Sequence, residues 1–357
     1  MPGFEWFGDE ERKEVQDVLD TGVLFRYGFD QARKGHWKAR TFEEELSRCL
    51  GSGYAHLCSS GTSALGIALA ACGVSAGDEV IVPPFTFVAT VEALLTAGAI
   101  PVFAEIDETL CLDPQSVRAA ITPRTRAVMP VHMCGAMARI DELKTICDEK
   151  KLVLIEDAAE SLGSYYKGRH TGQRGRISAL SFNGNKIITT GGGGAILTND
   201  SELGALAKHM TTTAKLPHRW EFNHDRVGYN YRLPNLNAAV GCAQIEQLPD
   251  FIRRKRKLAK AYQDAFNGIK GATIFSEPEF AESNYWLNAI ILSPEYADLR
   301  DDILAKTHEA GLLTRPAWTL MYKLPMYQDC PRMECDVAEQ ISARLINIPS
   351  SSSLLSN

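Results

Sequence analysis

The hydrophobic and polar positions between residues 54 and 156 change their spacing several times. Short runs of β-branched and aliphatic residues, typical of buried strands, alternate with segments in which apolar residues recur every three or four positions, as in amphipathic helices. The predicted strands are 54–58, 79–82, 101–106, 126–131 and 152–155, and the predicted helices are 62–72, 87–97 and 140–148. This alternation predicts an α/β fold with a mainly parallel sheet sandwiched by helices.

The remainder of the chain has fewer strand signals and longer helical segments. Helical spacing covers 9–20, 201–211, a segment that begins at Pro234, 248–266, 299–310 and 335–345, and strand patterns cover 177–182, 195–198, 285–292 and 346–350. Towards the C-terminus this mixture predicts a smaller α+β domain. We place the boundary near 247, which gives a large domain over 1–247, with an N-terminal arm over 1–45, and a small domain over 248–357.

Composition narrows the class of protein. The 357 residues are 45% hydrophobic and 23% charged, as in an ordinary soluble globular protein, and the net charge of −6 argues against a nucleic-acid partner. No secretory signal is visible in Met1–Phe7, and no apolar stretch reaches membrane-spanning length. Nine cysteines without a CxxC pair or a histidine cluster predict reduced thiols and no metal site. We therefore expect a cytoplasmic protein that does not associate with membranes.

One lysine stands out just after the predicted strand 177–182. Lys186 is followed by the glycine run Gly191–Gly194 and then by a second strand. The lysine could be a solvated residue of a surface hairpin, as most lysines are. Alternatively, it could be an amine held for Schiff-base chemistry, with glycines that leave room for a flat cofactor. An oxidoreductase with a Rossmann nucleotide loop fits less well, because these glycines lie between two strands and do not open a helix.

Two further segments carry hydroxyl groups. The segment SSGTSAL at 59 lies between a predicted strand and a predicted helix, where Gly61 and Thr62 could present amides and a hydroxyl to a phosphate. The same segment could be an ordinary helix N-cap. Ser181, five residues before Lys186, could add another hydroxyl near the phosphate.

A carboxylate and an aromatic ring follow two other predicted strands. Asp157 ends a buried strand, where a carboxylate is costly unless it is paired. Its partner could be a structural cation or a protonated pyridine nitrogen, and a cationic pyridine ring is an electron sink for carbanion chemistry. Phe87 could stack on such a ring, or it could simply pack in the core.

The segment 26–40 combines basic and aromatic residues. It could be a solvated surface loop, since charge runs usually face water. It could also supply cations such as Arg26 and Arg33 to an acidic small-molecule substrate, because both carboxylates and diphosphates are bound by arginine donors.

The order of these signals resembles that of pyridoxal-phosphate enzymes with the aspartate-aminotransferase fold, fold type I. More narrowly, the chain is similar to sugar aminotransferases of the DegT and StrS kind. The resemblance rests on SSGTSAL at 59, PPFTFVAT at 83, IEDAAESLG at 155, LSFNGNKIITTGGGGAI at 180, GYNYRLPNLNAAVG at 228, TRPAWTLMYKLPMY at 314 and LINIPSS at 345. These motifs extend over nearly the whole chain.

The resemblance implies that the cofactor is pyridoxal 5′-phosphate, joined to Lys186 as an internal aldimine. Asp157 would pair with the pyridine nitrogen, and Phe87 would stack on the ring. The phosphate would be held by Gly61, Thr62 and Ser181.

Three other positions follow from the resemblance. Asn230 matches a family asparagine that reaches the phosphate of the neighbouring subunit, which implies a homodimer with shared active sites. Arg232, beside it, is a candidate for binding a substrate carboxylate. Glu160 departs from the glutamine or histidine often found beside the phenolic oxygen of the cofactor. Because two anionic oxygens repel each other, we expect this carboxyl to be protonated or turned away.

The implied reaction is a transamination for cell-surface polysaccharide synthesis. L-Glutamate would leave as 2-oxoglutarate, and the resulting pyridoxamine 5′-phosphate would aminate a keto sugar. The C-terminal half is similar to aminotransferases for UDP-linked 4-keto sugars, whereas the N-terminal segment is similar to those for an 8-keto octulosonate of lipopolysaccharide. We favour the UDP-linked sugar. Alternatives are a dehydratase, against which Lys186 argues because such relatives carry histidine there, and a regulatory protein that retains the fold.

Overall fold

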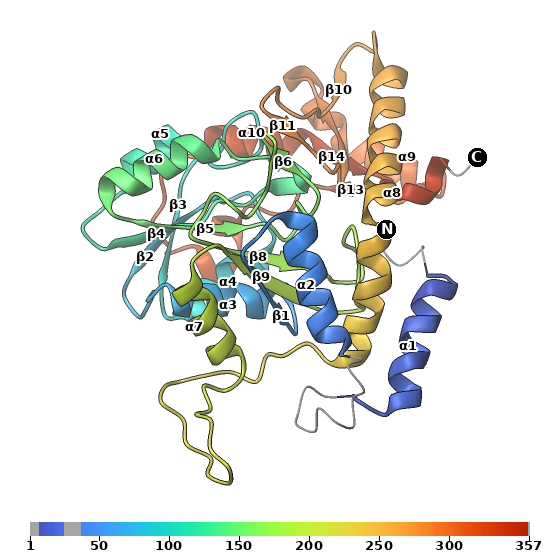
Figure 1. Cartoon of the computed structure of the whole chain (residues 1–357). Coiled ribbons are helices and arrows are strands. Elements are labelled where there is room, and N and C mark those ends of the chain that lie inside the picture. Colours follow the sequence, from blue (N-terminus) through green and yellow to red (C-terminus); the bar gives the residue numbers. More distant parts are fainter. Residues whose placement is uncertain (1–6, 25–36, 356–357) are drawn as a thin grey trace.

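The computed structural model describes residues 7–24 and 37–355. Its centre is a seven-stranded sheet in the order β1-β9-β8-β5-β4-β2-β3, in which β9 alone runs antiparallel to its neighbours. Helices lie on both faces of this sheet (Figure 1), which confirms the predicted α/β class. The strands are β1 (Tyr54–Cys58), β2 (Glu79–Val82), β3 (Ile100–Phe103), β4 (Thr125–Val128), β5 (Val153–Asp157), β8 (Ile177–Ser181) and β9 (Gly194–Thr198).

The helices around the sheet come from both halves of the chain. Between residues 54 and 211 every predicted strand and helix is present to within three residues. The sequence analysis missed α2, whose first turn falls in the segment 26–40, and α5, which Asp113 caps by accepting two backbone N–H bonds. The helices are α1 (Asp9–Thr21), α2 (Lys38–Leu50), α3 (Gly61–Ala71), α4 (Val88–Thr96), α5 (Pro114–Ala120), α6 (Ile140–Lys150), α7 (Ser201–Thr211) and α8 (Asn235–Phe266).

Alternate side chains of the central strands face two separate hydrophobic cores. Ala179 and Ile196 belong to the core that includes α3 and α7, whereas Leu180 and Leu197 belong to the core that includes α2 and α8. All four side chains are fully buried. This period of two is what a strand covered on both faces requires, and it fixes the register of each strand end at the edge of the sheet.

Helix α8 is a single helix of 32 residues, although the sequence analysis predicted two segments. Pro249 lies inside it, and a proline in a helix interior costs about 3 kcal/mol because it lacks an N–H and its ring clashes with the preceding turn. Ile245, Leu248 and Phe251 are buried in one core on both sides of this proline, and their packing offsets the cost. The domain boundary near 247 falls inside this helix and stays a prediction.

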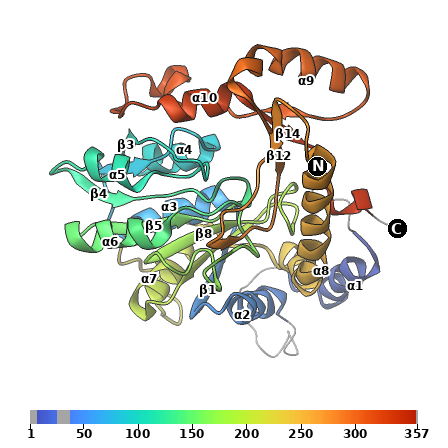
Figure 2. The same cartoon turned by 90° about the horizontal axis from the view of Figure 1, so that it is seen from above.

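The C-terminal part is built on a four-stranded antiparallel sheet in the order β10-β12-β14-β13, which confirms the predicted smaller α+β unit. Helices α9 and α10 lie beside it, away from the large sheet's centre (Figure 2). Within the described residues, no helix is long and apolar enough to cross a membrane. The strands and helices of the C-terminal part are β10 (Ala272–Ile274), β12 (Asn288–Leu292), β13 (Arg315–Pro316), β14 (Leu345–Ile348), α9 (Arg300–Glu309) and α10 (Asp336–Arg344).

Short elements connect the two main sheets. A small sheet in the order β11-β6-β7 pairs the segment after β5 with the segment before β12. Its strands are β6 (Tyr165–Tyr166), β7 (Arg169–His170) and β11 (Ala281–Glu282). The 3₁₀ turns are η1 (Met133–Gly135), η2 (Pro294–Leu299), η3 (Met321–Lys323), η4 (Pro325–Tyr327) and η5 (Ser352–Leu355).

Residues 212–230 form a two-stranded arm that projects from the body of the protein, at the bottom of Figure 1. Antiparallel bridges join Thr212 to Asn230 and Lys215 to His224. The sequence analysis predicted no strand in this segment, because a two-stranded arm that is mostly exposed lacks the alternation that marks a half-buried strand.

Gly241 of α8 lies directly against Phe42 of α2. A methyl group at 241 would come within 2.7 Å of Phe42 Cζ, and Phe42 is fully buried. We therefore expect Gly241→Ala to lower the free energy of unfolding by about 1–3 kcal/mol. In an open helix the same change stabilises by about 1 kcal/mol, so the sign is informative. Urea unfolding of the wild type and of the variant would measure the sign and the size of this change in the free energy of unfolding.

The matched control is Gly66→Ala in α3, where the added methyl group meets no atom within 4 Å. This variant should unfold at the same urea concentration as the wild type or at a higher one. Equal destabilisation of the two variants would contradict the packing argument.

Candidate active site

A cavity of about 330 Å³ opens at the carboxyl edge of the parallel strands. The last residues of β5 and β8, Asp157 and Ser181, reach this edge. Sheets of this type bind their ligands there. Seven residues that the sequence analysis singled out line this one cavity: Gly61, Thr62, Phe87, Asp157, Glu160, Ser181 and Lys186.

The N-terminus of α3 forms one end of the cavity. The Ser60 hydroxyl accepts the Ser63 N–H at 3.0 Å, and Ser63 Oγ accepts the Ser60 N–H at 2.9 Å, which is a reciprocal cap. A Cβ on Gly61 would lie 2.9 Å from Ser181 Cβ, so a glycine is needed for the serine to come this close. The segment is therefore an N-cap, and the positive end of the helix dipole also suits it to an anion.

Asp157 is buried with a hydrogen-bond donor on each carboxylate oxygen. Thr90 Oγ1 donates to Oδ2 at 2.8 Å, and the Ala159 N–H donates to Oδ1 at 3.1 Å. Desolvation outweighs these bonds and raises the pKa of Asp157 above its ordinary value. A cationic group bound in the cavity would stabilise this carboxylate.

Lys186 reaches into the same cavity from the loop after β8. Its Nζ lies 3.7 Å from Glu160 Oε1 and 4.0 Å from the centroid of the Trp286 ring. The side chain is 12% exposed, so the surface-hairpin interpretation is wrong. Glu160 Oε2 accepts the Cys134 N–H at 2.7 Å, and the carboxyl faces the lysine instead of turning away. Burial raises the pKa of Glu160.

The glycine run after Lys186 has a second purpose besides making room for a ligand. Gly192 and Gly193 line the cavity. A Cβ on Gly194, however, would lie 2.5 Å from the Ser60 carbonyl oxygen. This glycine therefore lets β9 run directly against the loop that precedes α3, which brings the lysine loop and the helix N-terminus together.

The sequence analysis missed several residues of the site. Thr90 follows Phe87 by three positions, one helical turn, so this spacing could have revealed it. Trp286 and Trp318 come from the C-terminal part and form an aromatic wall, with planes 10° apart and centroids 6.3 Å apart. Trp286 Nε1 donates to Asn185 O at 2.7 Å. No local pattern indicates a contact between residues so far apart in the chain.

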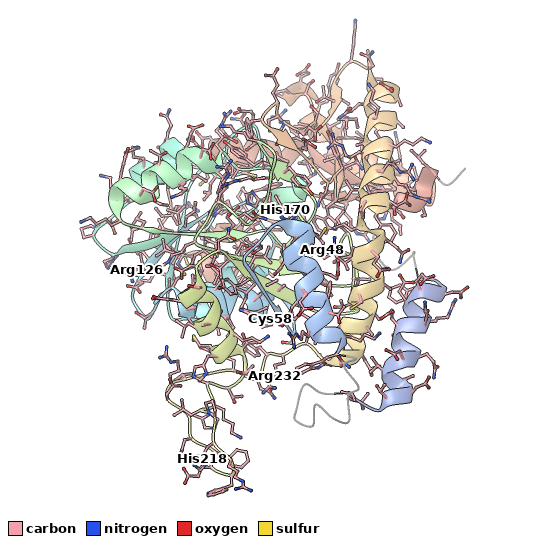
Figure 3. The ribbon with its side chains drawn as sticks, viewed as in Figure 1. Arg48, Cys58, Arg126, His170, His218 and Arg232 are labelled. Atoms are coloured by element: carbon pink, nitrogen blue, oxygen red, sulfur yellow. The ribbon has the colours of Figure 1, made fainter. Side chains whose placement is uncertain are left out.

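Two predicted residues, Asn230 and Arg232, are not among the residues that line the cavity. Asn230 is exposed at the base of the arm, and Arg232 follows it near the start of α8 (Figure 3). The Tyr231 carbonyl between them accepts the Ser59 N–H at 2.8 Å, so this segment runs beside the α3 N-terminus. Arg26 and Arg33 lie outside the described residues.

Side chains of α8 hold the loop between β8 and β9. Asn237 Nδ2 donates to Thr190 O at 2.7 Å, and Gln244 Oε1 accepts the Thr189 N–H at 3.3 Å. Gln244 Nε2 in turn donates to Glu11 Oε1 of α1 at 2.7 Å. The N-terminal helix, α8 and the lysine loop therefore form one hydrogen-bonded unit.

The site fits pyridoxal 5′-phosphate. It offers an amine for an aldehyde, a buried carboxylate for a ring nitrogen, and a helix N-terminus beside a serine for a phosphate. Together with the mainly parallel sheet and its smaller antiparallel partner, these groups define a pyridoxal-phosphate-dependent enzyme of fold type I.

The chain belongs to the DegT/DnrJ/EryC1/StrS aminotransferase family, whose family model matches residues 7–357. It is 36% identical over 342 residues to GDP-perosamine synthase of Vibrio cholerae, covering 95% of this chain and 90% of the relative. It is 33% identical over 347 residues to UDP-2-acetamido-2-deoxy-3-oxo-D-glucuronate aminotransferase of Pseudomonas aeruginosa, covering 95% and 92%.

Solved structures agree with this assignment. Helicobacter pylori PseC, described as an aminotransferase involved in the biosynthesis of pseudoaminic acid, matches with a TM-score of 0.90 and 26% identity, over 99% of this chain and 94% of that chain. The protein is a pyridoxal-phosphate-dependent sugar aminotransferase of nucleotide-sugar and polysaccharide biosynthesis. The predicted family, fold, enzyme class and cofactor are confirmed.

The loop after Asp157 depends on a buried neutral histidine, His170, labelled in Figure 3. His170 Nε2 accepts the Gly163 N–H at 2.7 Å, which leaves Nδ1 to donate to Thr171 O at 2.5 Å. Burial lowers the pKa of His170 from 6.5 to about 4.

Because the pKa of His170 is lower in the folded protein than in the unfolded chain, acid favours unfolding. The stability that the neutral ring contributes is complete above pH 6.5 and is lost as the pH falls towards 4, by up to roughly 3 kcal/mol. Urea unfolding between pH 7 and pH 4 should show this loss. His170→Gln, which retains a donor and an acceptor, should show a shallower pH dependence; equal slopes would contradict the argument.

Proposed function

We propose that this enzyme transfers the amino group of L-glutamate to a nucleotide-linked 4-keto deoxysugar. The observation that supports this most is that both relatives, matched over nearly their whole length, are named for sugars carried on GDP or UDP. UDP is favoured here because the segments from 155 to 230 resemble aminotransferases for UDP-linked 4-keto sugars. The product would enter a cell-surface polysaccharide.

The cavity walls suit the reacting ring of such a sugar. Trp286 and Trp318 offer an apolar face to the C–H groups of a deoxysugar, and Asn183 and Asn185 line the cavity with amides for its hydroxyl groups. A volume of about 330 Å³ is small for a ligand site, so the nucleotide would lie at the mouth, where Phe87 is 50% exposed.

We assign the cofactor contacts to the residues that line the cavity. Lys186 would bond the aldehyde, Asp157 would pair with the ring nitrogen and Phe87 would stack on the ring. Gly61, Thr62 and Ser181 would bind the phosphate. When bound, the cofactor supplies an electron sink that stabilises a carbanion beside its nitrogen.

The amine of Lys186 is placed to move the proton that transamination requires. It lies under the Trp286 ring, which excludes water from one side of Nζ. An amine in such a partly dry site can accept a proton at Nζ from the carbon of the amino donor and deliver it to the opposite carbon. Lys186 would thus transfer the proton in both halves of the reaction, first with the amino-group donor and then with the keto acceptor.

We also propose that the enzyme is a homodimer with shared active sites. The arm 212–230 carries Trp220, Phe222 and Val227 at 68%, 77% and 75% exposure, and exposed apolar groups of this kind usually contact a partner. Asn230, at the base of the arm, is exposed beside the α3 N-terminus, and a second copy of the chain would bring it to the partner's phosphate site.

The substrate proposal can be tested with enzyme in the pyridoxamine 5′-phosphate form. A UDP-linked 4-keto sugar, a GDP-linked 4-keto sugar and an 8-keto octulosonate would be compared by the return of pyridoxal absorbance. We expect the UDP-linked sugar to react fastest, by about tenfold or more. Lys186→Ala is the control, because without the amine no borohydride-reducible bond to the protein can form.

Other outcomes would reassign the function. A faster reaction with the GDP-linked sugar would change the nucleotide, and a faster reaction with the octulosonate would replace the nucleotide sugar altogether. An intact chromophore with no response to glutamate or to any keto sugar would favour the regulatory alternative.

Shared sites predict that two defective variants complement each other. Lys186→Ala and Asn230→Ala homodimers should each be severely impaired. Random exchange of subunits makes mixed dimers in which one site has both native residues, so activity should recover to about a quarter of the wild-type value. Mixed dimers verified by native mass spectrometry that remain inactive would contradict sharing.

A further inference from the structure

Glu160 and Lys186 form a buried pair inside the cavity. Lys186 Nζ lies 3.7 Å from Glu160 Oε1, while Oε2 accepts the Cys134 N–H at 2.7 Å. One carboxylate oxygen is thus held by the backbone, and the other is directed at the amine. The two side chains are 12% and 4% exposed, so water screens their interaction poorly.

Groups from the other elements around this pair do not compete for its proton. From β5, Asp157 has both oxygens engaged by hydrogen-bond donors. From the C-terminal part, Trp286 covers the amine with a ring that has no basic atom. Within residues 7–24 and 37–355, no carboxylate other than Glu160 forms an ion pair with Lys186.

Two cysteine thiols that interact with the carboxyl remain protonated. Burial raises the pKa of Cys111 to about 12 and that of Cys134 well above its ordinary value. Burial also raises the pKa of Glu160 itself. A proton that reaches Glu160 is therefore held more firmly than on a solvated carboxyl, and neither thiolate is available to take it.

We propose that Glu160 takes up the proton that Lys186 must lose before its amine can react with a carbonyl group. A small movement of the flexible lysine brings Nζ within hydrogen-bond distance of Oε1. The proton passes from Nζ to Oε1, which leaves a neutral amine and a carboxylic acid. The nitrogen lone pair then bonds to the carbonyl carbon, and the carbonyl oxygen leaves as water with the two remaining N–H protons.

Internal transfer avoids an unpaired buried charge. If the lysine proton went to solvent, the Glu160 carboxylate would stay buried beside Asp157 without its cation, and breaking a buried pair in this way is strongly unfavourable. Transfer within the pair removes both charges together. When the amine is released again, Glu160 returns the proton to Nζ. Glu160 therefore holds one proton for as long as the lysine nitrogen is bonded to the carbonyl carbon.

This inference rests on the proposed role of Lys186 as the reacting amine, and its first test uses the apoprotein. Trace acetylation with acetic anhydride, followed by mass spectrometry of the Lys186 peptide, measures the fraction of neutral amine at each pH. Glu160→Gln removes the charge that favours the ammonium, so the midpoint should fall by about one to three pH units. An unchanged midpoint would overturn the pairing.

The chain offers a control for this substitution outside the cavity, where Glu43 also pairs with a lysine and accepts a backbone N–H. Lys208 Nζ donates to Glu43 Oε1 at 2.7 Å and to Oε2 at 2.8 Å, and the Leu57 N–H donates to Oε1 at 3.0 Å. Glu43→Gln should lower the midpoint of Lys208 and leave that of Lys186 unchanged. Unaltered midpoints at the other lysines would report an intact fold in both variants.

Proton counting then tests the transfer itself. Pyridoxal 5′-phosphate is titrated into the apoprotein in a calorimeter, in two buffers of different ionisation enthalpy. The pH is kept below the measured midpoint of Lys186 in each variant. Because the wild type keeps the lysine proton on Glu160, Glu160→Gln should release about one more proton per chain. Equal release with a normal chromophore in both proteins would overturn the transfer alone, whereas a wild type without a chromophore would overturn the proposed function as well.

Discussion

The burial of two carboxyl groups close together, Asp157 and Glu160, is the constraint on which this site depends. Each would be costly without polar partners, and the fold supplies those partners from separate elements: the Thr90 hydroxyl for one, and the Cys134 amide and the Lys186 ammonium for the other. Among residues 7–24 and 37–355, no cation forms an ion pair with Asp157, and a cationic ring bound in the cavity would stabilise its carboxylate. Stability and ligand binding are therefore coupled at the same edge of the sheet.

The site could be predicted from the sequence as far as strand ends define it. Asp157 and Lys186 follow buried strands, and the carboxyl ends of parallel strands meet at one edge, so their proximity was implied by the pattern alone. The contact of Trp286 with Lys186 depends on how the C-terminal part docks, which periodicity does not encode. Glu160 could be recognised as unusual from the sequence, but the direction of its carboxyl group is set by a hydrogen bond from the Cys134 amide. The backbone of Cys134 is left-handed, with φ of +56°, and no sequence signal predicts this.

The fold was similarly predictable where the pattern was local. Strands and helices from 54 to 211 follow from changes of period, although period does not reveal that β9 runs antiparallel. The cap Asp113–Pro114 is a sequence signal for α5 that a search for long apolar faces passes over. The two helical segments predicted on either side of 247 are one helix in the structure, because burial on both sides of Pro249 keeps α8 continuous where local preference favours a break.

The continuity of α8 has a consequence for how such enzymes can be recombined. A helix of 32 residues is about 48 Å long. Near its start, Asn237 and Gln244 bind the lysine loop, and farther along, the buried ammonium of Lys255 donates to the Ser350 carbonyl in the C-terminal part. A chimera joined in the middle of this helix would take the two sets of contacts from different parents. When segments are exchanged between relatives, residues 235–266 should therefore be transferred together, because this helix contacts both the lysine loop and the C-terminal part.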